Sequence, residues 1–129
     1  MPHLQAWTTA RRRIAMKFLD EIYNPALALP TYGSADESVW HLFPVLVTEG
    51  SRDEFQAHLR SQGVATGVHY PRIIPDQPAL ADAGFADYST RLENARRFAR
   101  SEVSLPIHPF MTDIEVETVI RACNDWSRS

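Results

Sequence analysis

Two side chains that could do chemistry stand next to each other after a short apolar segment: His69 and Tyr70, with Pro71 and Arg72 directly behind them. Histidine can hold a phosphate or a sugar hydroxyl, or transfer a proton near neutral pH, and the guanidinium of Arg72 could pair with an anionic ligand. Polar and aromatic groups at a strand end often form one wall of a ligand site, because the strand fixes their positions. A structural alternative is that His69 hydrogen-bonds the proline-rich loop and Arg72 is an ordinary surface residue. Residue types alone favour this alternative.

The remaining histidines and the single cysteine do not form a pattern typical of a metal site. No two histidines lie four residues apart on one predicted helix, and Cys123 has no second cysteine to join. We therefore expect no metal site and no intrachain disulfide. Cys123 falls on the apolar face of the last predicted helix, which indicates a small core residue. A lone cysteine also fits a reducing, cytoplasmic location.

Length and composition indicate one ordinary globular domain. The chain has 129 residues and a net charge of -3, which gives no reason to expect nucleic acid or an anionic membrane as a partner. No apolar run approaches the ~20 residues of a membrane span, and the start of the chain does not read as a signal peptide. Lys17 is the only lysine.

The first half of the chain predicts two helices and two strands. Apolar residues at spacings of three and four predict a helix over residues 2–22, followed by a loop over 25–38. Residues 39–47 read as a strand, with Pro44 at an edge or a bulge. Ser51 and Glu54 have the spacing of a capping box and start a second helix that Gly63 ends. Residues 64–68 read as a short strand.

The second half predicts two more helices and one strand. Three prolines and a glycine make residues 70–88 irregular. An amphipathic helix follows over 89–100, built on Leu92, Ala95, Phe98 and Ala99. Residues 102–107 read as a strand, and a capping box at Thr112 starts the last helix, whose apolar face ends at Trp126. This order predicts an α+β fold, a small, mostly antiparallel sheet with helices packed on it.

Four segments, in order, resemble the C-terminal portion of the DegT/StrS-type sugar aminotransferases. The opening PHLQAWTTARRRIAMKFLDEI is similar to the long helix that links the two domains of these enzymes. The next segments are VWHLFPVLV with SRDEFQAHLRSQGVATGVHYP, then DQPAL, and finally SLPIHPFMTDIEVETVI. Many family members read Pro-x-His after His-Tyr-Pro, whereas this chain has Arg72 to Asp76, so the second histidine of the motif is missing.

The resemblance implies a linking helix at residues 1–24 and the small domain of a fold-type I aminotransferase at 25–129. Such enzymes use pyridoxal phosphate (PLP), are usually homodimers, and move an amino group to a nucleotide-linked keto-sugar in polysaccharide or amino-sugar biosynthesis. Their Schiff-base lysine lies in the large domain, upstream of the linking helix, and Lys17 stands in no matching context. The resemblance therefore places no catalytic residue in this chain, and PLP is not expected to bind it alone. His69 and Tyr70 match the motif and, with Arg72, are the candidates for approaching substrate or cofactor.

The expected partner is the missing large domain, or a second copy of the chain, bound through the first helix. An apolar stripe of Trp7, Ile14, Phe18 and Ile22 suggests this surface. The substrate of the complete enzyme would be a nucleotide sugar. Two alternatives stay open: an independent binding module that kept the fold without the chemistry, and a half-enzyme that a separate large domain completes in trans.

Overall fold

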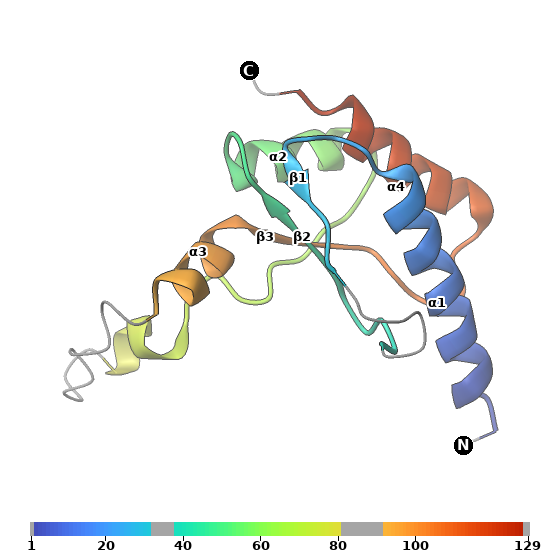
Figure 1. Ribbon diagram of the computed structural model, residues 1–129, viewed down its shortest axis with the longest axis horizontal. Helices are drawn as coiled ribbons and strands as arrows, with labels where there is room; N and C mark the ends of the chain where they lie inside the picture. The colour runs from blue at the N-terminus through green and yellow to red at the C-terminus, as the bar shows by residue number, and fades with distance from the viewer. Residues whose placement is uncertain (1, 32–37, 81–91, 128–129) are drawn as a thin grey trace.

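A three-stranded antiparallel sheet, with strand order β1-β2-β3, lies at the centre of the computed structural model (Figure 1). The structure describes residues 2–31, 38–80 and 92–127. Its strands are β1 (Leu27–Ala28), β2 (Phe43–Val47) and β3 (Glu102–Leu105). Its helices are α1 (Leu4–Glu21), α2 (Arg52–Ser61), α3 (Glu93–Ser101) and α4 (Asp113–Asp125), with two 3-10 turns at Ile74–Asp76 and Pro78–Leu80. The α+β prediction with an antiparallel sheet is confirmed.

The register of β2 against β3 separates the sheet into two different faces. Phe43 pairs with Leu105 and Val45 with Val103, and all four belong to the hydrophobic core. The alternate pairs are Pro44 with Ser104 and Leu46 with Glu102. Because successive side chains of a strand point to opposite faces, Glu102 and Ser104 lie on the face turned away from this core.

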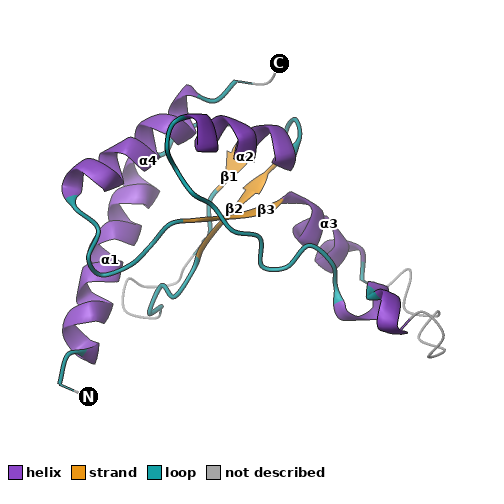
Figure 2. Cartoon of the chain, turned by 180° about the vertical axis from the view of Figure 1, so that it is seen from behind, coloured by secondary structure: helices purple, strands orange, loops and turns teal. Residues whose placement is uncertain are grey.

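Helices α1, α2 and α4 cover the core face of the sheet, while α3 extends to the other side of the molecule (Figure 2). The ring of Phe18 from α1 packs edge-on against Phe43, with 5.1 Å between ring centroids. Phe55 and Leu59 of α2 and the apolar face of α4 complete the core. None of the helices in the described part of the chain is long and apolar enough to cross a membrane.

The apolar stripe predicted for the first helix divides into a buried part and an exposed end. Ile14, Phe18 and Ile22 are buried in the core of this chain, so the expectation that they are free to bind a partner is wrong. Trp7, by contrast, is 36% exposed. Within α1, the large exposed apolar side chains, Leu4 and Trp7, both lie at the N-terminal end.

Both predicted capping boxes are present. Ser51 and Glu54 cap α2, and Thr112 and Glu115 cap α4. Two orphan donors of each helix start are satisfied in this way. Gly63 follows α2 with φ +78°, a left-handed conformation that favours glycine and ends the helix. The predicted apolar face of α4, including Cys123 and Trp126, is buried.

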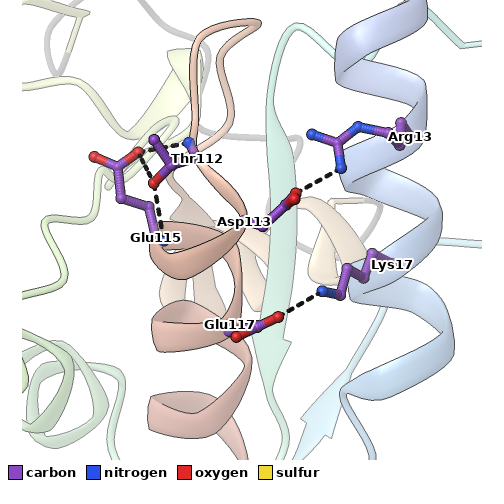
Figure 3. A network of polar contacts seen from close by, with 6 residues as sticks. All are labelled: Arg13, Lys17, Thr112, Asp113, Glu115 and Glu117. Atoms are coloured by element: carbon purple, nitrogen blue, oxygen red, sulfur yellow. Dashed lines mark hydrogen bonds and ion pairs between the residues drawn. The ribbon is translucent and has the colours of Figure 1, made fainter.

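Two ion pairs join α1 to α4 along their exposed sides (Figure 3). Arg13 contacts Asp113 at 2.8 Å, and Lys17 contacts Glu117 at 3.2 Å. Exposed pairs of this kind typically contribute ~0–1 kcal/mol each. The buried apolar contacts beneath these pairs therefore supply most of the stability between the two helices.

The predicted strand over residues 64–68 is wrong. Gly67 makes a single bridge to Ser104, and the preceding residues are held by α2 instead of a neighbouring strand. The Val64 amide donates to the carbonyl of Leu59, and the side chain of Gln56 donates to Thr66 at 2.9 Å. These bonds turn the chain around the end of α2, so that it reaches the sheet only at Gly67.

Three further strand boundaries differ from the prediction. First, Leu27 and Ala28 form a short strand, β1, inside the segment 25–38 that was predicted as a loop. The second concerns β2, which begins at Phe43 because Trp40 has φ +48°, a conformation incompatible with an extended strand. Pro44 lies in the central strand rather than at an edge, and it is tolerated because β1 pairs only with Leu46 and Val47. The third is the end of β3, at Leu105, directly before Pro106.

The predicted helix over 89–100 is observed as α3, which begins at Glu93; residues 89–91 lie outside the described residues. Its predicted apolar face is not a core face, since Ala99 is its only buried residue in the structure and Phe98 is 39% exposed. Phe98 is instead available to line a surface groove.

Candidate functional site

The candidate residues lie on the face of the sheet opposite the three core helices. The chain reaches the outer edge of β3 at Gly67, whose amide and carbonyl exchange two backbone hydrogen bonds with Ser104. His69 follows two residues later and is half-buried, joined to Tyr70 by a cis peptide bond. The β3 strand therefore positions the His69 segment, whereas the sequence placed His69 at the end of a strand over residues 64–68 that the structure does not contain.

A polar network connects His69 to two buried side chains of β3. The backbone amide of His69 donates to Glu102 Oε2 at 2.6 Å. The hydroxyl of Ser104 donates to Glu102 Oε1 at 2.5 Å, and the same hydroxyl oxygen lies 2.9 Å from His69 Nδ1. Both Glu102 and Ser104 are almost completely buried. A buried carboxyl is costly unless it is hydrogen-bonded, and here each of its two oxygens accepts one bond.

Sequence reasoning missed Glu102 and Ser104. They stand in the strand E-V-S-L, where polar and apolar residues alternate. This alternation is typical of a strand with one solvated face, so it gave no reason to expect burial. No local signal in the sequence indicates their burial, because the His69 segment that hydrogen-bonds to them lies more than 30 residues away.

The structure brings His69, Tyr70 and Arg72 to one surface groove. Its other wall consists of α3 side chains, among them Phe98, and Ile73 also lines it. Tyr70 is 69% exposed, and its ring meets that of His69 at 74° with centroids 5.5 Å apart. The groove thus combines an imidazole, a phenol and a guanidinium with an apolar wall, which suits a ligand with both polar and apolar surface.

An ion pair fixes the turn behind this groove. Arg96 of α3 contacts Asp76 through two nitrogens, at 2.7 and 2.8 Å. The hydrogen bond from Arg96 holds the pKa of Asp76 below its usual value. This bidentate pair ties the 3-10 turn at Ile74–Asp76 to α3, and so holds the Arg72 side of the groove against the Phe98 side.

The residues present do not fit a PLP site. Lys17, the only lysine, belongs to α1 on the core side of the sheet and is engaged by Glu117. It therefore does not belong to the groove that His69 lines. In the described ranges, no group of three or more His, Cys, Asp or Glu residues could hold a metal ion.

Comparison with known families identifies the chain. The sequence profile of the DegT/DnrJ/EryC1/StrS aminotransferase family matches residues 1–124. The chain belongs to this family. This confirms the resemblance stated from the four sequence segments.

Relatives within the DegT/DnrJ/EryC1/StrS family are longer than this chain. The dTDP-3-amino-3,4,6-trideoxy-alpha-D-glucose transaminase of Streptomyces venezuelae is 34% identical over 128 residues, which cover 98% of this chain and 33% of the relative. The dTDP-3-amino-3,6-dideoxy-alpha-D-galactopyranose transaminase of Aneurinibacillus thermoaerophilus is 40% identical over 116 residues, or 90% of this chain and 30% of the relative.

Solved structures agree with this family assignment. The crystal structure of S. venezuelae DesV, in complex with a ketimine intermediate, superimposes with a TM-score of 0.86 at 35% identity and covers 97% of this chain. The match covers 33% of that protein. The chain thus spans about a third of the length of the relatives it matches, in agreement with the predicted C-terminal portion.

Proposed function

We propose that this chain is the C-terminal part of a PLP-dependent nucleotide-sugar aminotransferase, acting in the cytoplasm, with a linking helix at residues 1–24 and the small domain at 25–129. The observation that carries the proposal is a family match over residues 1–124 in a chain that spans about a third of its relatives. The chain supplies one wall of the active site and does not transfer amino groups alone.

The position of Lys17 supports the proposed inactivity of the isolated chain. A lysine that bonds covalently to a cofactor needs an uncharged amine placed over the reacting carbon. Lys17 Nζ instead lies 3.2 Å from the carboxylate of Glu117, in an ion pair between α1 and α4. The lysine and the cofactor cradle are therefore supplied by a large domain, either on the same polypeptide or in trans.

The groove at His69, Tyr70 and Arg72 is the proposed substrate-side wall. Two relatives are named for dTDP-linked amino sugars. A nucleotide-linked sugar carries hydroxyls, which an imidazole or a phenol can hydrogen-bond, and a diphosphate, which a guanidinium can pair with. The three candidate side chains thus match the chemistry of such a substrate.

The N-terminal end of α1 is the proposed contact with the large domain or with a second copy of the chain. Trp7 packs edge-on against exposed Phe110, with 6.2 Å between ring centroids, and Leu4 is exposed one turn earlier. We call Leu4, Trp7 and Phe110 the Trp7 patch. Exposed aromatic rings next to each other are typical of a protein-protein contact.

Reductive labelling tests the proposed inactivity. The isolated chain is incubated with PLP, reduced with borohydride, digested and mapped by mass spectrometry. We expect no stoichiometric adduct at Lys17, and Lys17→Arg, which keeps the positive charge, serves as the control for nonspecific labelling. Stoichiometric labelling of Lys17 together with transaminase activity of the isolated chain would overturn the proposal.

A binding measurement separates the alternatives. The large-domain portion of the S. venezuelae relative is purified and mixed with the chain, and complex formation is followed by sedimentation. A half-enzyme completed in trans forms a complex that the Trp7→Glu variant weakens. If the chain is an independent module, neither the wild type nor the Trp7→Glu variant binds the large domain.

A further inference from the structure

The hydrogen bonds around Glu102 determine which way the hydroxyl of Ser104 points. Glu102 accepts from the His69 amide at Oε2 and from the Ser104 hydroxyl at Oε1. A serine hydroxyl has one hydrogen to donate and lone pairs to accept with. Since this hydrogen is used toward Glu102, Ser104 Oγ can only accept from the imidazole of His69.

The proton position on His69 follows from that arrangement. Nδ1 lies 2.9 Å from Ser104 Oγ and must be the donor, so the neutral ring carries its hydrogen on Nδ1. Nε2 then carries a free lone pair. Within residues 2–31, 38–80 and 92–127 this nitrogen has no hydrogen-bond partner, and His69 lines the groove shared with Tyr70 and Arg72.

Gly67 allows the imidazole to occupy this position. A Cβ atom at residue 67 would lie 2.8 Å from Cε1 of His69, the carbon between the two ring nitrogens. Such a contact is too short for any real side chain, so alanine at this position would push the ring off Ser104. Gly67 therefore has two roles: its backbone pairs with Ser104 of β3, and its lack of a side chain leaves room for the imidazole of His69.

We propose that Glu102 and Ser104 are positioning residues that hold His69 as the Nδ1–H tautomer, so that Nε2 accepts a hydrogen bond from a hydroxyl of a ligand bound in the groove. The buried carboxylate orients the serine, the serine orients the ring, and the ring offers an acceptor next to the phenol of Tyr70. That the hydroxyl belongs to a sugar rests on the proposed function; the tautomer does not.

Nitrogen NMR of the uniformly labelled chain tests the tautomer directly. Long-range proton–nitrogen spectra distinguish a protonated ring nitrogen from one with a free lone pair, at a pH where the ring is neutral. His58 is an internal reference, because its Nε2 lies 3.0 Å from the carbonyl oxygen of Ala122, which only accepts. We expect opposite patterns in one spectrum, with the proton on Nδ1 in His69 and on Nε2 in His58.

Two variants test the role of the buried pair. Ser104→Ala removes the acceptor of Nδ1–H, and Glu102→Gln provides an amide donor that frees the serine hydroxyl to donate to the ring. In each, the ratio of Nδ1–H to Nε2–H in His69 should fall at least about fivefold, the effect of one hydrogen bond of ordinary net strength. His58 should not change, and neither residue should change in Thr9→Ala, which removes an exposed hydroxyl of α1.

The proposal is overturned if wild-type His69 carries its proton on Nε2, or if both variants leave its pattern unchanged while His58 shows that they are folded. The wild-type spectrum decides the tautomer even when a variant does not fold. Neither PLP nor substrate is needed, so this result is independent of the aminotransferase assignment. Conversely, failure of the proposed function in an activity assay would leave the tautomer result standing.

Discussion

Truncation of Trp126 to alanine should destabilise the chain strongly, because this side chain closes the core where α4 ends. Trp126 is 6% exposed, and its ring lies 4.9 Å from that of Phe55, which is completely buried in α2. A buried aromatic side chain removes ~150–250 Å² from water, which corresponds to about 4–6 kcal/mol at ~25 cal/mol per Å². Residual compactness of the unfolded chain lowers this figure. We expect a loss of about 3–5 kcal/mol, the range measured for such truncations.

The Trp126→Ala variant removes the side chain and keeps the backbone hydrogen bond at this position. The Trp126 carbonyl accepts from Asn24 Nδ2 at 2.7 Å, and alanine keeps this bond. Urea unfolding should show the midpoint lowered by about 2 M, and thermal unfolding a transition lowered by about 10–20 °C. Trp7→Ala is the matched control, since the same residue type at 36% exposure should change stability by about 1 kcal/mol or less. Equal effects of the two variants would refute the reasoning, because the end of α4 would then be frayed rather than packed.

The remaining predictions concern a thiol, a helix cap and a surface. Burial raises the pKa of Cys123 to about 12, so a thiol reagent at about pH 8 should react only after unfolding; rapid reaction of the native protein would contradict this. Two hydrogen bonds lower the pKa of Glu115: one from the backbone amide of Thr112, which the Thr112→Ala variant keeps, and one from its hydroxyl, which the variant removes. The folded state therefore favours the ionised form, and its stabilisation is complete above the unfolded value of 4.5 and lost as the pH falls through the lowered folded value. The stability difference between wild type and Thr112→Ala should then shrink from about pH 6 to about pH 3, and a constant difference would argue against the cap. Finally, Trp7→Glu should lower any self-association seen by sedimentation, whereas Tyr23→Glu, at an exposed residue beyond the other end of α1, should not; equal behaviour would exclude the Trp7 patch.

Local signals in the sequence were sufficient for most of the fold. The two capping boxes fix the starts of α2 and α4 through side chains only three residues apart, so tertiary contacts are not needed to predict them. The apolar face of α4 was predictable for the same reason. Long-range contacts decide the parts that were not predicted. The two-residue β1 exists only through pairing with the end of β2, and residues 64–66 are turned by bonds to α2.

The candidate site was predictable only in its exposed half. His69, Tyr70 and Arg72 lie close together in sequence. Their types alone favour an ordinary structural role, and the match of His69 and Tyr70 to the family motif is what makes the three residues candidates for a ligand wall. Glu102 and Ser104 act from a distant segment. Their role depends on which face of β3 they occupy and on what covers that face, and both are properties of the three-dimensional arrangement.

A chimeric enzyme tests the central claim most directly. The matching third of the S. venezuelae transaminase is replaced by this chain, which is 34% identical to it over 128 residues, and amino transfer is measured with the relative's own substrate. We predict a folded, PLP-binding, active chimera whose kcat/KM falls at least about tenfold with His69→Ala, as expected for loss of one substrate hydrogen bond. His41→Ala, at an exposed histidine outside the groove, should leave the activity unchanged. A chimera that folds and binds PLP but is inactive, or one that is indifferent to His69→Ala, would contradict the account.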